Sequence, residues 1–152
     1  MLRKFVHVFI SVRVQVALLI RLRHWIYRKR FLGRGVLLQW VRYLLHIISG
    51  CDFSVGAQIP ASTKFPHPTG IVIGEGVVFM EGVTIFQNTT FGSHGRRGER
   101  QAYPHLEGGA TVYAGAVVIG GVVLGEGCIV GANSVVLNSV PQGSSVKGNP
   151  AK

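Results

Sequence analysis

The sequence predicts a mainly β protein, a parallel β-helix built from hexapeptide repeats, with a short α-helical segment before it. Three observations predict this architecture. Glycine is abundant, with 21 residues among 152, although the chain contains only 6 prolines. Small or apolar residues recur every six positions from residue 55 onward, and the whole net positive charge lies before residue 51. The chain has room for one domain and an appendage.

The charge changes abruptly near Gly50. The first fifty residues carry ten basic side chains and no acidic one, whereas the remainder carries six of each. The ten are Arg3, Lys4, Arg13, Arg21, Arg23, Arg28, Lys29, Arg30, Arg34 and Arg42. We therefore expect two parts, a basic amphipathic helical segment over residues 1–50 and a repeat domain over residues 51–152.

Basic residues interrupt every apolar run of the first part. None of these runs reaches the roughly 20 residues that span a bilayer. Apolar residues recur at helical spacing between Leu37 and Ile48, and Trp25, Tyr27 and Trp40 lie close to the basic clusters. Such helices favour an anionic lipid surface, so we expect peripheral membrane contact through residues 1–50.

Two alternatives remain for the basic segment. In the first, its helices pack on the repeat domain or on neighbouring subunits, with a solvated charged face. A basic arm also attracts nucleic acid non-specifically through its phosphates. Because no base-reading motif accompanies this arm, we expect no nucleic-acid partner.

The second part repeats with a period of six residues. The repeated position holds Val55, Ala61, His67, Ile73, Phe79, Ile85 and Phe91, and then Leu106, Val112, Val118, Leu124, Val130 and Val136. Each hexad is interpreted as one short strand and one turn. Three hexads make a triangular coil, and the residues at the repeated position point inward to a shared core. A chance pattern or an antiparallel barrel is the alternative, but neither explains two phased runs.

The interruption between Phe91 and Leu106 predicts a loop over residues 92–105. Its sequence is polar and basic, with His94, Arg96, Arg97 and Arg100 among its members. A solenoid accepts such an insertion as a loop that leaves the coil, and functional residues concentrate in loops of this kind. The loop is therefore the first place to look for residues that contact a substrate.

The cysteines and the N-terminus favour the cytoplasm. Cys51 and Cys128 are too few for a disulfide framework, and no signal peptide with a small-residue cleavage site is visible. With the basic helical segment, this predicts a reduced, cytoplasmic protein that lies at the inner face of the membrane.

Two segments of the repeat domain resemble a known family. Residues 67–75, His-Pro-Thr-Gly-Ile-Val-Ile-Gly-Glu, are similar to the active-site segment of the serine acetyltransferase branch of hexapeptide acetyltransferases. Residues 148–152, Gly-Asn-Pro-Ala-Lys, resemble the segment that ends the β-helix in that branch, after which family members usually continue. The basic N-terminus and Pro104-His105-Leu106 look more like the short exopolysaccharide acetyltransferases of the colanic-acid type. This resemblance covers residues 51–152 and implies a left-handed coil, a homotrimer and acetyl-CoA as co-substrate, without a metal.

The chain departs from true serine acetyltransferases where they bind the acceptor. Pro66 stands where they place an Asp before the catalytic His, and Ala102 and Tyr103 stand where they have an Arg and a second His. Their large acidic helical domain is also absent. We therefore expect O-acetylation of a sugar, free or lipid-linked, in a surface or exopolysaccharide. Serine O-acetylation in cysteine biosynthesis is the alternative, and a non-catalytic trimeric scaffold is the second alternative.

The resemblance and the chemistry together assign the catalytic residues. An alcohol attacks a thioester only when a base takes its proton, and histidine, with an ordinary pKa near ~6.5, suits this role. We expect His67 to be that base, since a polar residue at an inward-pointing position needs a reason. Tyr103, or backbone N–H groups near Gly92, would stabilise the oxyanion, and His105 would orient the acceptor.

The resemblance also implies where the donor binds. Small residues on an outer ridge would admit the pantetheine arm, and Lys147 would pair with a phosphate of coenzyme A. The ridge residues are Ala114, Gly115, Ala132 and Ser134, with Gly92 on the donor side of the loop. A zinc enzyme on the same fold would need three histidines. His67, His94 and His105 are the candidates, but the closely spaced pair expected of that family is missing.

Overall fold

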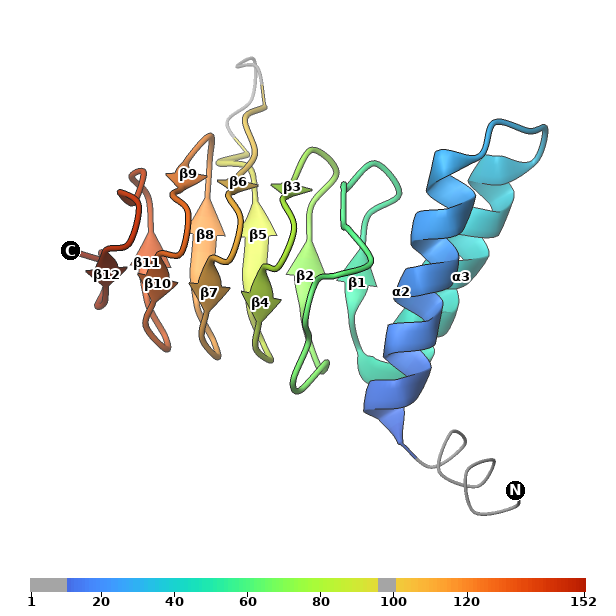
Figure 1. Ribbon diagram of the computed structural model, residues 1–152, viewed down its shortest axis with the longest axis horizontal. Coiled ribbons are helices and arrows are strands. Elements are labelled where there is room, and N and C mark those ends of the chain that lie inside the picture. Colours follow the sequence, from blue (N-terminus) through green and yellow to red (C-terminus); the bar gives the residue numbers. More distant parts are fainter. Residues whose placement is uncertain (1–10, 96–100) are drawn as a thin grey trace.

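The computed structural model describes residues 11–95 and 101–152, and it consists of two α-helices followed by a stack of short strands (Figure 1). Arg3 and Lys4, and Arg96, Arg97 and Arg100 of the predicted loop, lie outside these residues. The helices are α2 (Val12–Arg28) and α3 (Arg34–Ser49). The strands are β1 (Asp52–Phe53), β2 (Val72–Ile73), β3 (Val78–Phe79), β4 (Thr84–Ile85), β5 (Thr90–Gly92), β6 (His105–Leu106), β7 (Thr111–Val112), β8 (Val117–Ile119), β9 (Val123–Leu124), β10 (Ile129–Val130), β11 (Val135–Val136) and β12 (Ser145–Val146).

The strands form three parallel sheets, which are the faces of a prism. Face 1 is β1-β2-β5-β8-β11, face 2 is β3-β6-β9, and face 3 is β4-β7-β10-β12. The chain visits faces 1, 2 and 3 in turn, and each strand pairs in parallel with the equivalent strand of the next coil. The predicted parallel β-helix is therefore confirmed.

Two inward residues per hexad build a continuous core. Ile73, Phe79 and Ile85 lie on the strands, and Ile71 and Val77 precede them by two positions; all five are buried. Phe79 meets Phe91 of the next coil edge to face, with ring centroids 5.3 Å apart. Burial of each large apolar side chain contributes about 1.5–3 kcal/mol, so the repeated position is what holds the coils together.

The first coil is two residues longer than the second. Phe53 pairs with Ile73, twenty positions later, whereas Ile73 pairs with Phe91, eighteen positions later. The extra residues lie in the turn over residues 66–70, between the last strand-like segment of this coil and β2. A longer turn shifts the phase of every residue that precedes it.

The phase predicted for the first coil is therefore wrong. Its inward positions are Phe53, Ile59 and Phe65, with the rings of Phe53 and Phe65 stacked 5.4 Å apart. Val55 is half-buried, and Ala61 and His67 are exposed, although the six-residue period predicted that all three point inward. From Ile73 onward the predicted phase holds, because no turn up to Phe91 departs from the regular length.

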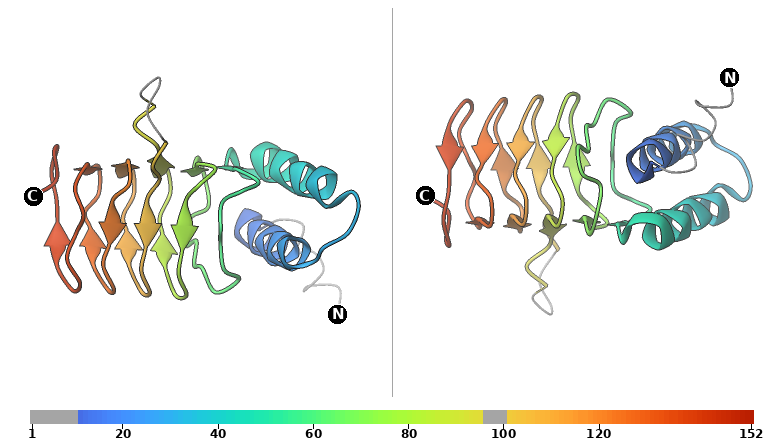
Figure 2. Two further views of the ribbon diagram at one scale, coloured as in Figure 1. Left: turned by 90° about the horizontal axis from the view of Figure 1, so that it is seen from above. Right: turned by 90° about the horizontal axis from the view of Figure 1, so that it is seen from below.

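The two helices form an antiparallel hairpin that lies across the first coil (Figures 1 and 2). α2 buries Val16, Ile20 and Ile26, and α3 buries Leu38, Val41 and Leu45. Gly50, with φ of 66°, ends α3 in the left-handed conformation that glycine adopts at little cost. The hairpin thus covers the end of the β-helix core that would otherwise face water.

Arg23 of α2 supplies hydrogen-bond donors to the backbone at this end of the β-helix. It is 3% exposed, and its guanidinium donates hydrogen bonds to the carbonyl oxygens of Ser54 (2.9 Å), Val55 (3.2 Å) and Ala57 (2.6 Å). These carbonyls belong to the first coil, which has no preceding coil to pair with. Burial lowers the pKa of Arg23 to about 10, so the side chain remains charged at neutral pH.

A second contact joins α3 to β1. Arg42 donates from Nε to Oδ1 of Asp52 (2.5 Å) and from Nη2 to Oδ2 (2.9 Å), a bidentate ion pair at a partly exposed site. The hydrogen bond from Arg42 lowers the pKa of Asp52 below its ordinary value. The sequence analysis identified neither this pair nor the Arg23 contact.

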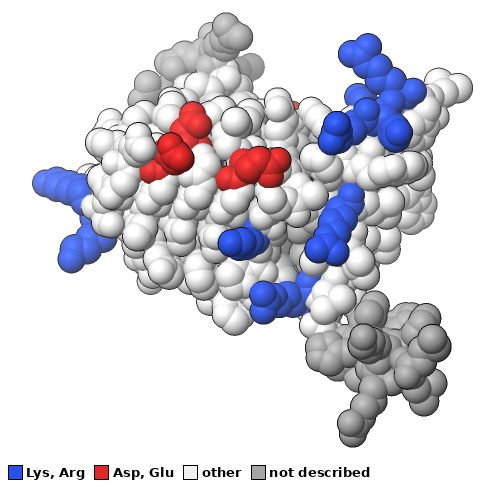
Figure 3. All heavy atoms as spheres, in the orientation of Figure 1, with Lys and Arg blue, Asp and Glu red and all other residues white. Residues whose placement is uncertain are grey.

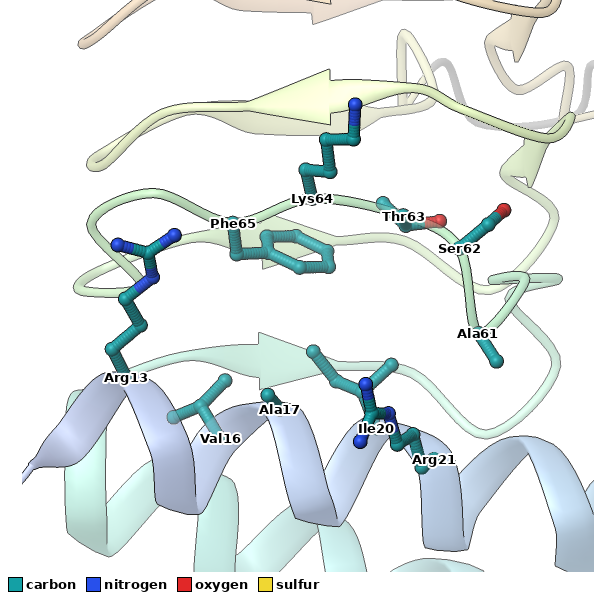
Figure 4. A pocket seen from close by; sticks show the side chains of 10 residues that line it. All are labelled: Arg13, Val16, Ala17, Ile20, Arg21, Ala61, Ser62, Thr63, Lys64 and Phe65. Atoms are coloured by element: carbon teal, nitrogen blue, oxygen red, sulfur yellow. The ribbon is translucent and has the colours of Figure 1, made fainter. Parts of the chain in front are cut away.

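Between α2 and the first coil lies a cavity of about 330 Å³ (Figure 4). Its lining residues are Arg13, Val16, Ala17, Ile20 and Arg21 of α2 and Ala61, Ser62, Thr63, Lys64 and Phe65 of the coil. Arg13 and Arg21 extend from α2 toward the coil. The hydroxyl of Thr63 is buried without a hydrogen-bond partner among the described residues. The hairpin is therefore held at Arg23 and Arg42 rather than by close packing along all of α2.

Candidate active site

His67 lies at the corner where face 3 meets face 1, in the turn that lengthens the first coil. Its ring leans on Phe86 of the next coil, with centroids 6.2 Å apart, and Phe86 stacks on Tyr113 at 4.9 Å. The two aromatic residues occupy the same corner in successive coils and form a wall beside the histidine. Sequence reasoning missed both, although an aromatic residue repeated at an outer turn position was a usable signal.

The strand register places the predicted donor residues on this same corner. Lys64 pairs with Thr84, Thr84 with Thr111, and Thr111 with Ile129. At the corner that follows, the backbone N–H groups of Asn88, Gly115 and Asn133 donate to the carbonyl oxygens of Thr69, Gln87 and Ala114. The equivalent residues are therefore Thr69, Gln87, Ala114 and Ala132, and His67 lies two residues before Thr69 in the same turn. Neighbouring strands are ~4.8 Å apart, so three coils place Ala132 about 14 Å from His67 along the axis.

The corner continues one coil further to Lys147. Val146 pairs with Val130, and the backbone of Lys147 lies against Gly131, where an added Cβ would stand 3.1 Å from Cβ of Lys147. Lys147 itself is exposed. The structure thus arranges an imidazole, two alanines and an amine in order along one edge of the prism, which we call the donor ridge (residues 67, 87, 114, 115, 132 and 147).

Gly115 lies on the donor ridge in a left-handed turn conformation. It has φ of 72°, and Asn88 and Asn133, at the equivalent positions of the neighbouring coils, have φ of 57° and 56°. The side-chain oxygen of Asn133 lies directly against Gly115, so a Cβ there would overlap it. An L-residue is also strained at this φ. Because Asn88 and Asn133 adopt the same conformation, it is the overlap with the Asn133 side chain that requires glycine here, whatever ligand the ridge binds.

Ser134, which was expected on the ridge, and Gln87, which was not, differ in the polar groups that they offer to a ligand. Ser134 is fully buried, and its Oγ accepts a hydrogen bond from the backbone N–H of Gly148 (3.2 Å), so a ligand contact there would come from backbone. Gln87 was not singled out by sequence reasoning. Its Oε1 is buried without a partner among the described residues, so it can accept a hydrogen bond from a ligand N–H.

Gly92, Tyr103 and His105 lie near a different corner, where face 1 meets face 2. The Tyr103 ring packs over the backbone of Gly74 and Gly76, and an added Cβ at Gly74 would come within 3.0 Å of the ring. Gly92 ends β5, and the residues that follow it directly leave the prism (Figure 2). The structure therefore brings these three residues to one region and His67 to another.

His105 has an acidic neighbour. It lies on β6 between Val78 and Val123, and its Nε2 is 3.2 Å from Oε1 of Glu107. This contact fixes the orientation of the imidazole. No group of three His, Cys, Asp or Glu side chains that could hold a metal ion occurs among residues 11–95 and 101–152, so the zinc alternative gains no support.

The comparisons with known proteins agree with this geometry. Residues 103–138 match the family described as bacterial transferase hexapeptide (six repeats). The match covers the part of the β-helix from Tyr103 to Asn138. No curated protein matches the sequence significantly.

Solved structures of serine acetyltransferases are similar over nearly the whole chain. The soybean apoenzyme shares 31% identity at a TM-score of 0.82, covering 96% of this chain and 59% of that one. The enzyme from Vibrio cholerae O1 biovar El Tor N16961 shares 31% at 0.81, covering 94% and 54%. The coenzyme A complex from Brucella abortus strain S19 shares 29% at 0.81, covering 93% and 55%. The predicted left-handed β-helix is thereby confirmed, and the chain spans somewhat more than half the length of these enzymes.

Proposed function

We propose that this protein is an O-acetyltransferase that uses acetyl-CoA and acts on a hydroxyl acceptor, a sugar of a surface or exopolysaccharide. The donor ridge is the observation that carries the proposal, because it aligns a histidine, small residues and a lysine along one corner. Two of the similar serine acetyltransferase structures are complexes with coenzyme A. Because this chain has the same fold as those enzymes, we infer that its donor ridge binds the same donor.

An extended donor fits the spacing of the ridge. Ala114 and Ala132 leave the backbone accessible, and Gln87 Oε1 would accept a hydrogen bond from an amide N–H of the pantetheine arm. Four coils separate His67 from Lys147, about 19 Å along the axis. The thioester would lie at the His67 end and the phosphates at the Lys147 end.

The chemistry then requires one proton to move. His67 takes the proton of the acceptor hydroxyl as its oxygen attacks the acetyl carbonyl, and the protonated imidazole returns it to the departing thiolate of coenzyme A. The tetrahedral intermediate carries a negative oxygen, which Tyr103 or a backbone N–H near Gly92 would stabilise. A positioned base of this kind contributes about 10²–10⁴-fold to the rate.

The separation of the two groups of candidate residues supports a homotrimer. His67 and Tyr103 occupy different corners of one prism, so a single chain does not unite them. In a three-fold assembly, each subunit would present its donor ridge to the Tyr103–His105 corner of its neighbour. Each active site would then lie between two subunits.

Two acceptors remain to be distinguished. Pro66, beside His67, carries no charge to bind the amino group of an amino acid, which favours a sugar. The similar structures are serine acetyltransferases, one of them in complex with cysteine, and this favours L-serine at least as well. A non-catalytic trimeric scaffold would use the same fold without binding the donor.

The test is release of coenzyme A from acetyl-CoA, measured with L-serine and with a panel of sugars in separate reactions. Turnover with a sugar alone supports a polysaccharide acetyltransferase. Turnover with L-serine alone replaces the sugar by the alternative acceptor. If no acceptor is acetylated and calorimetry detects no acetyl-CoA binding, the proposed enzyme activity is wrong.

A further inference from the structure

The free end of the helical hairpin, residues 25–34, exposes apolar side chains on a fixed turn. Leu32 is fully exposed, and Trp25 and Phe31 are 57% and 42% exposed. Gly33, with φ of 89°, starts α3, and Arg34 Nη1 donates a hydrogen bond to the carbonyl oxygen of Tyr27 (3.3 Å). We call residues 25–34 the hairpin tip. A tip that displays large apolar groups in this way is typical of a docking site.

Basic side chains surround these apolar groups. Arg28, Lys29 and Arg30 precede Phe31 directly and are exposed. Lys29 Nζ lies 6.0 Å from the centre of the Trp25 ring. Basic side chains gather over this end of the hairpin, whereas the acidic ones visible in the same view lie over the β-helix (Figure 3). Residues 1–50 contain no Asp or Glu that could neutralise the tip.

The outer side of α3 extends the apolar surface. Trp40, Tyr43 and Ile47 are more than half exposed on the side of the helix opposite Leu38 and Leu45. The remaining large apolar residues that are exposed on α2 and α3 are Val12, Leu18, Leu22, Val36, Leu37 and Leu44. No helix in the described ranges is long and apolar enough to cross a membrane. An amphipathic helix of this kind lies in the plane of an interface.

We propose that the hairpin tip docks on a lipid bilayer that contains anionic lipid. Phe31 and Leu32 enter the region below the headgroups, and Arg28, Lys29 and Arg30 pair with lipid phosphates. Charge decides against a second copy of the tip, because two copies would bring cations together with no carboxylate between them. An anionic surface neutralises the same cations. This proposal does not depend on acetyl transfer.

Flotation of the full chain with vesicles tests the proposal. The wild type should bind vesicles of phosphatidylcholine with phosphatidylglycerol, bind phosphatidylcholine alone weakly, and lose binding as salt rises. The variant Arg28→Gln/Lys29→Gln/Arg30→Gln should bind the anionic vesicles on the order of 100-fold more weakly. The variant Phe31→Ser/Leu32→Ser should also lose binding, and in a Trp40→Phe background it should abolish the blue shift of Trp25 fluorescence that vesicles produce.

The matched control is Leu137→Ser/Lys152→Gln, which removes one exposed apolar side chain and one exposed basic side chain at the far end of the β-helix. It should bind as the wild type does. Helical circular dichroism shows that each variant is folded. The proposal is overturned if the wild type ignores anionic vesicles, or if both tip variants bind as tightly as the control. A fall in oligomer mass caused by the tip substitutions, measured by sedimentation velocity, would also overturn it by making the tip a subunit contact.

Discussion

The helical hairpin and the β-helix differ in charge and in how they bury apolar residues. Residues 51–152 balance six basic against six acidic groups, and the two inward positions of each hexad are buried almost without exception. The hairpin is basic throughout and buries one side of each helix, while Trp25, Trp40 and Ile47 stay exposed on the other. The β-helix buries its inward apolar residues within its own coils, whereas the hairpin leaves large apolar side chains exposed on its outer side.

This difference suits the two regions to different functions, ligand binding by the β-helix and docking by the hairpin. The regular coils place the donor ridge residues at fixed spacing, which suits the binding of an extended small molecule. The hairpin carries no residue of the donor ridge and instead presents charge and aromatic rings at its free end. If catalysis belongs to one region and docking to the other, substitutions should affect them independently.

The largest effect expected is that substitutions in one region abolish catalysis without changing vesicle binding, and that substitutions in the other do the opposite. His67→Ala should lower turnover of acetyl-CoA with a soluble acceptor by about 10²–10⁴-fold, because it removes the base, while binding to anionic vesicles is unchanged. Arg28→Gln/Lys29→Gln/Arg30→Gln should do the reverse. Assaying both variants for coenzyme A release and for flotation tests this. Loss of both properties in one folded variant would contradict the assignment of catalysis and docking to different regions.

The next largest effect is expected on stability, from the contact that joins the hairpin to the first coil. Arg23→Met removes a buried cation and leaves the carbonyls of Ser54, Val55 and Ala57 without donors, so unfolding should become easier by about 2–4 kcal/mol. Arg21→Met, on the same helix but exposed, should cost less than about 0.5 kcal/mol. Denaturant titrations of both variants measure the difference. Equal stabilities would mean that the hairpin does not seal the β-helix through Arg23.

A smaller effect is expected inside the β-helix. Gly115→Ala should cost about 1–3 kcal/mol, from left-handed strain and from overlap with the Asn133 oxygen. Gly127→Ala is the matched control, since Gly127 has φ of 63° and nothing within 4 Å of an added Cβ, so it measures the strain alone. Thermal unfolding should rank the variants in this order, and Asn133→Gly should relieve the extra cost at position 115.

The smallest effect concerns the second contact of the hairpin. Arg42 lowers the pKa of Asp52 in the folded protein, so this pair stabilises the fold above the ordinary Asp pKa of 3.8 and loses its contribution as pH falls through the lowered value. Because the pair is partly exposed, Arg42→Gln should cost at most about 1 kcal/mol at pH 7. Unfolding measured from pH 7 to pH 2 should show the two proteins converging in acid.

Much of the fold could be predicted because the repeat is local. An inward residue every six positions needs no knowledge of distant contacts, and the change of charge at Gly50 is visible in composition alone. The phase of the first coil could not be predicted this way, since the period cannot show that the turn at residues 66–70 holds two more residues. His67 was selected partly because it was expected to point inward, yet it is exposed at a corner.

The site was predictable only in part, for a related reason. The resemblance placed Ala114 and Ala132 on one ridge, and the backbone register brings both to the corner that holds His67. Gln87 and Phe86 were missed because their nearness to His67 depends on the length of the first coil. Arg23 could not be distinguished from its exposed neighbours, since its burial follows from where α2 rests on the β-helix.

A structure of the protein crystallised with coenzyme A tests the central claim most directly. We predict that the coenzyme lies along the donor ridge, with its sulfur beside His67, its pantetheine arm over Ala114 and Ala132, and its phosphates toward Lys147. Coenzyme A bound at the Tyr103–His105 corner without contact to any donor ridge, or failure to bind at saturating concentration, would contradict the account.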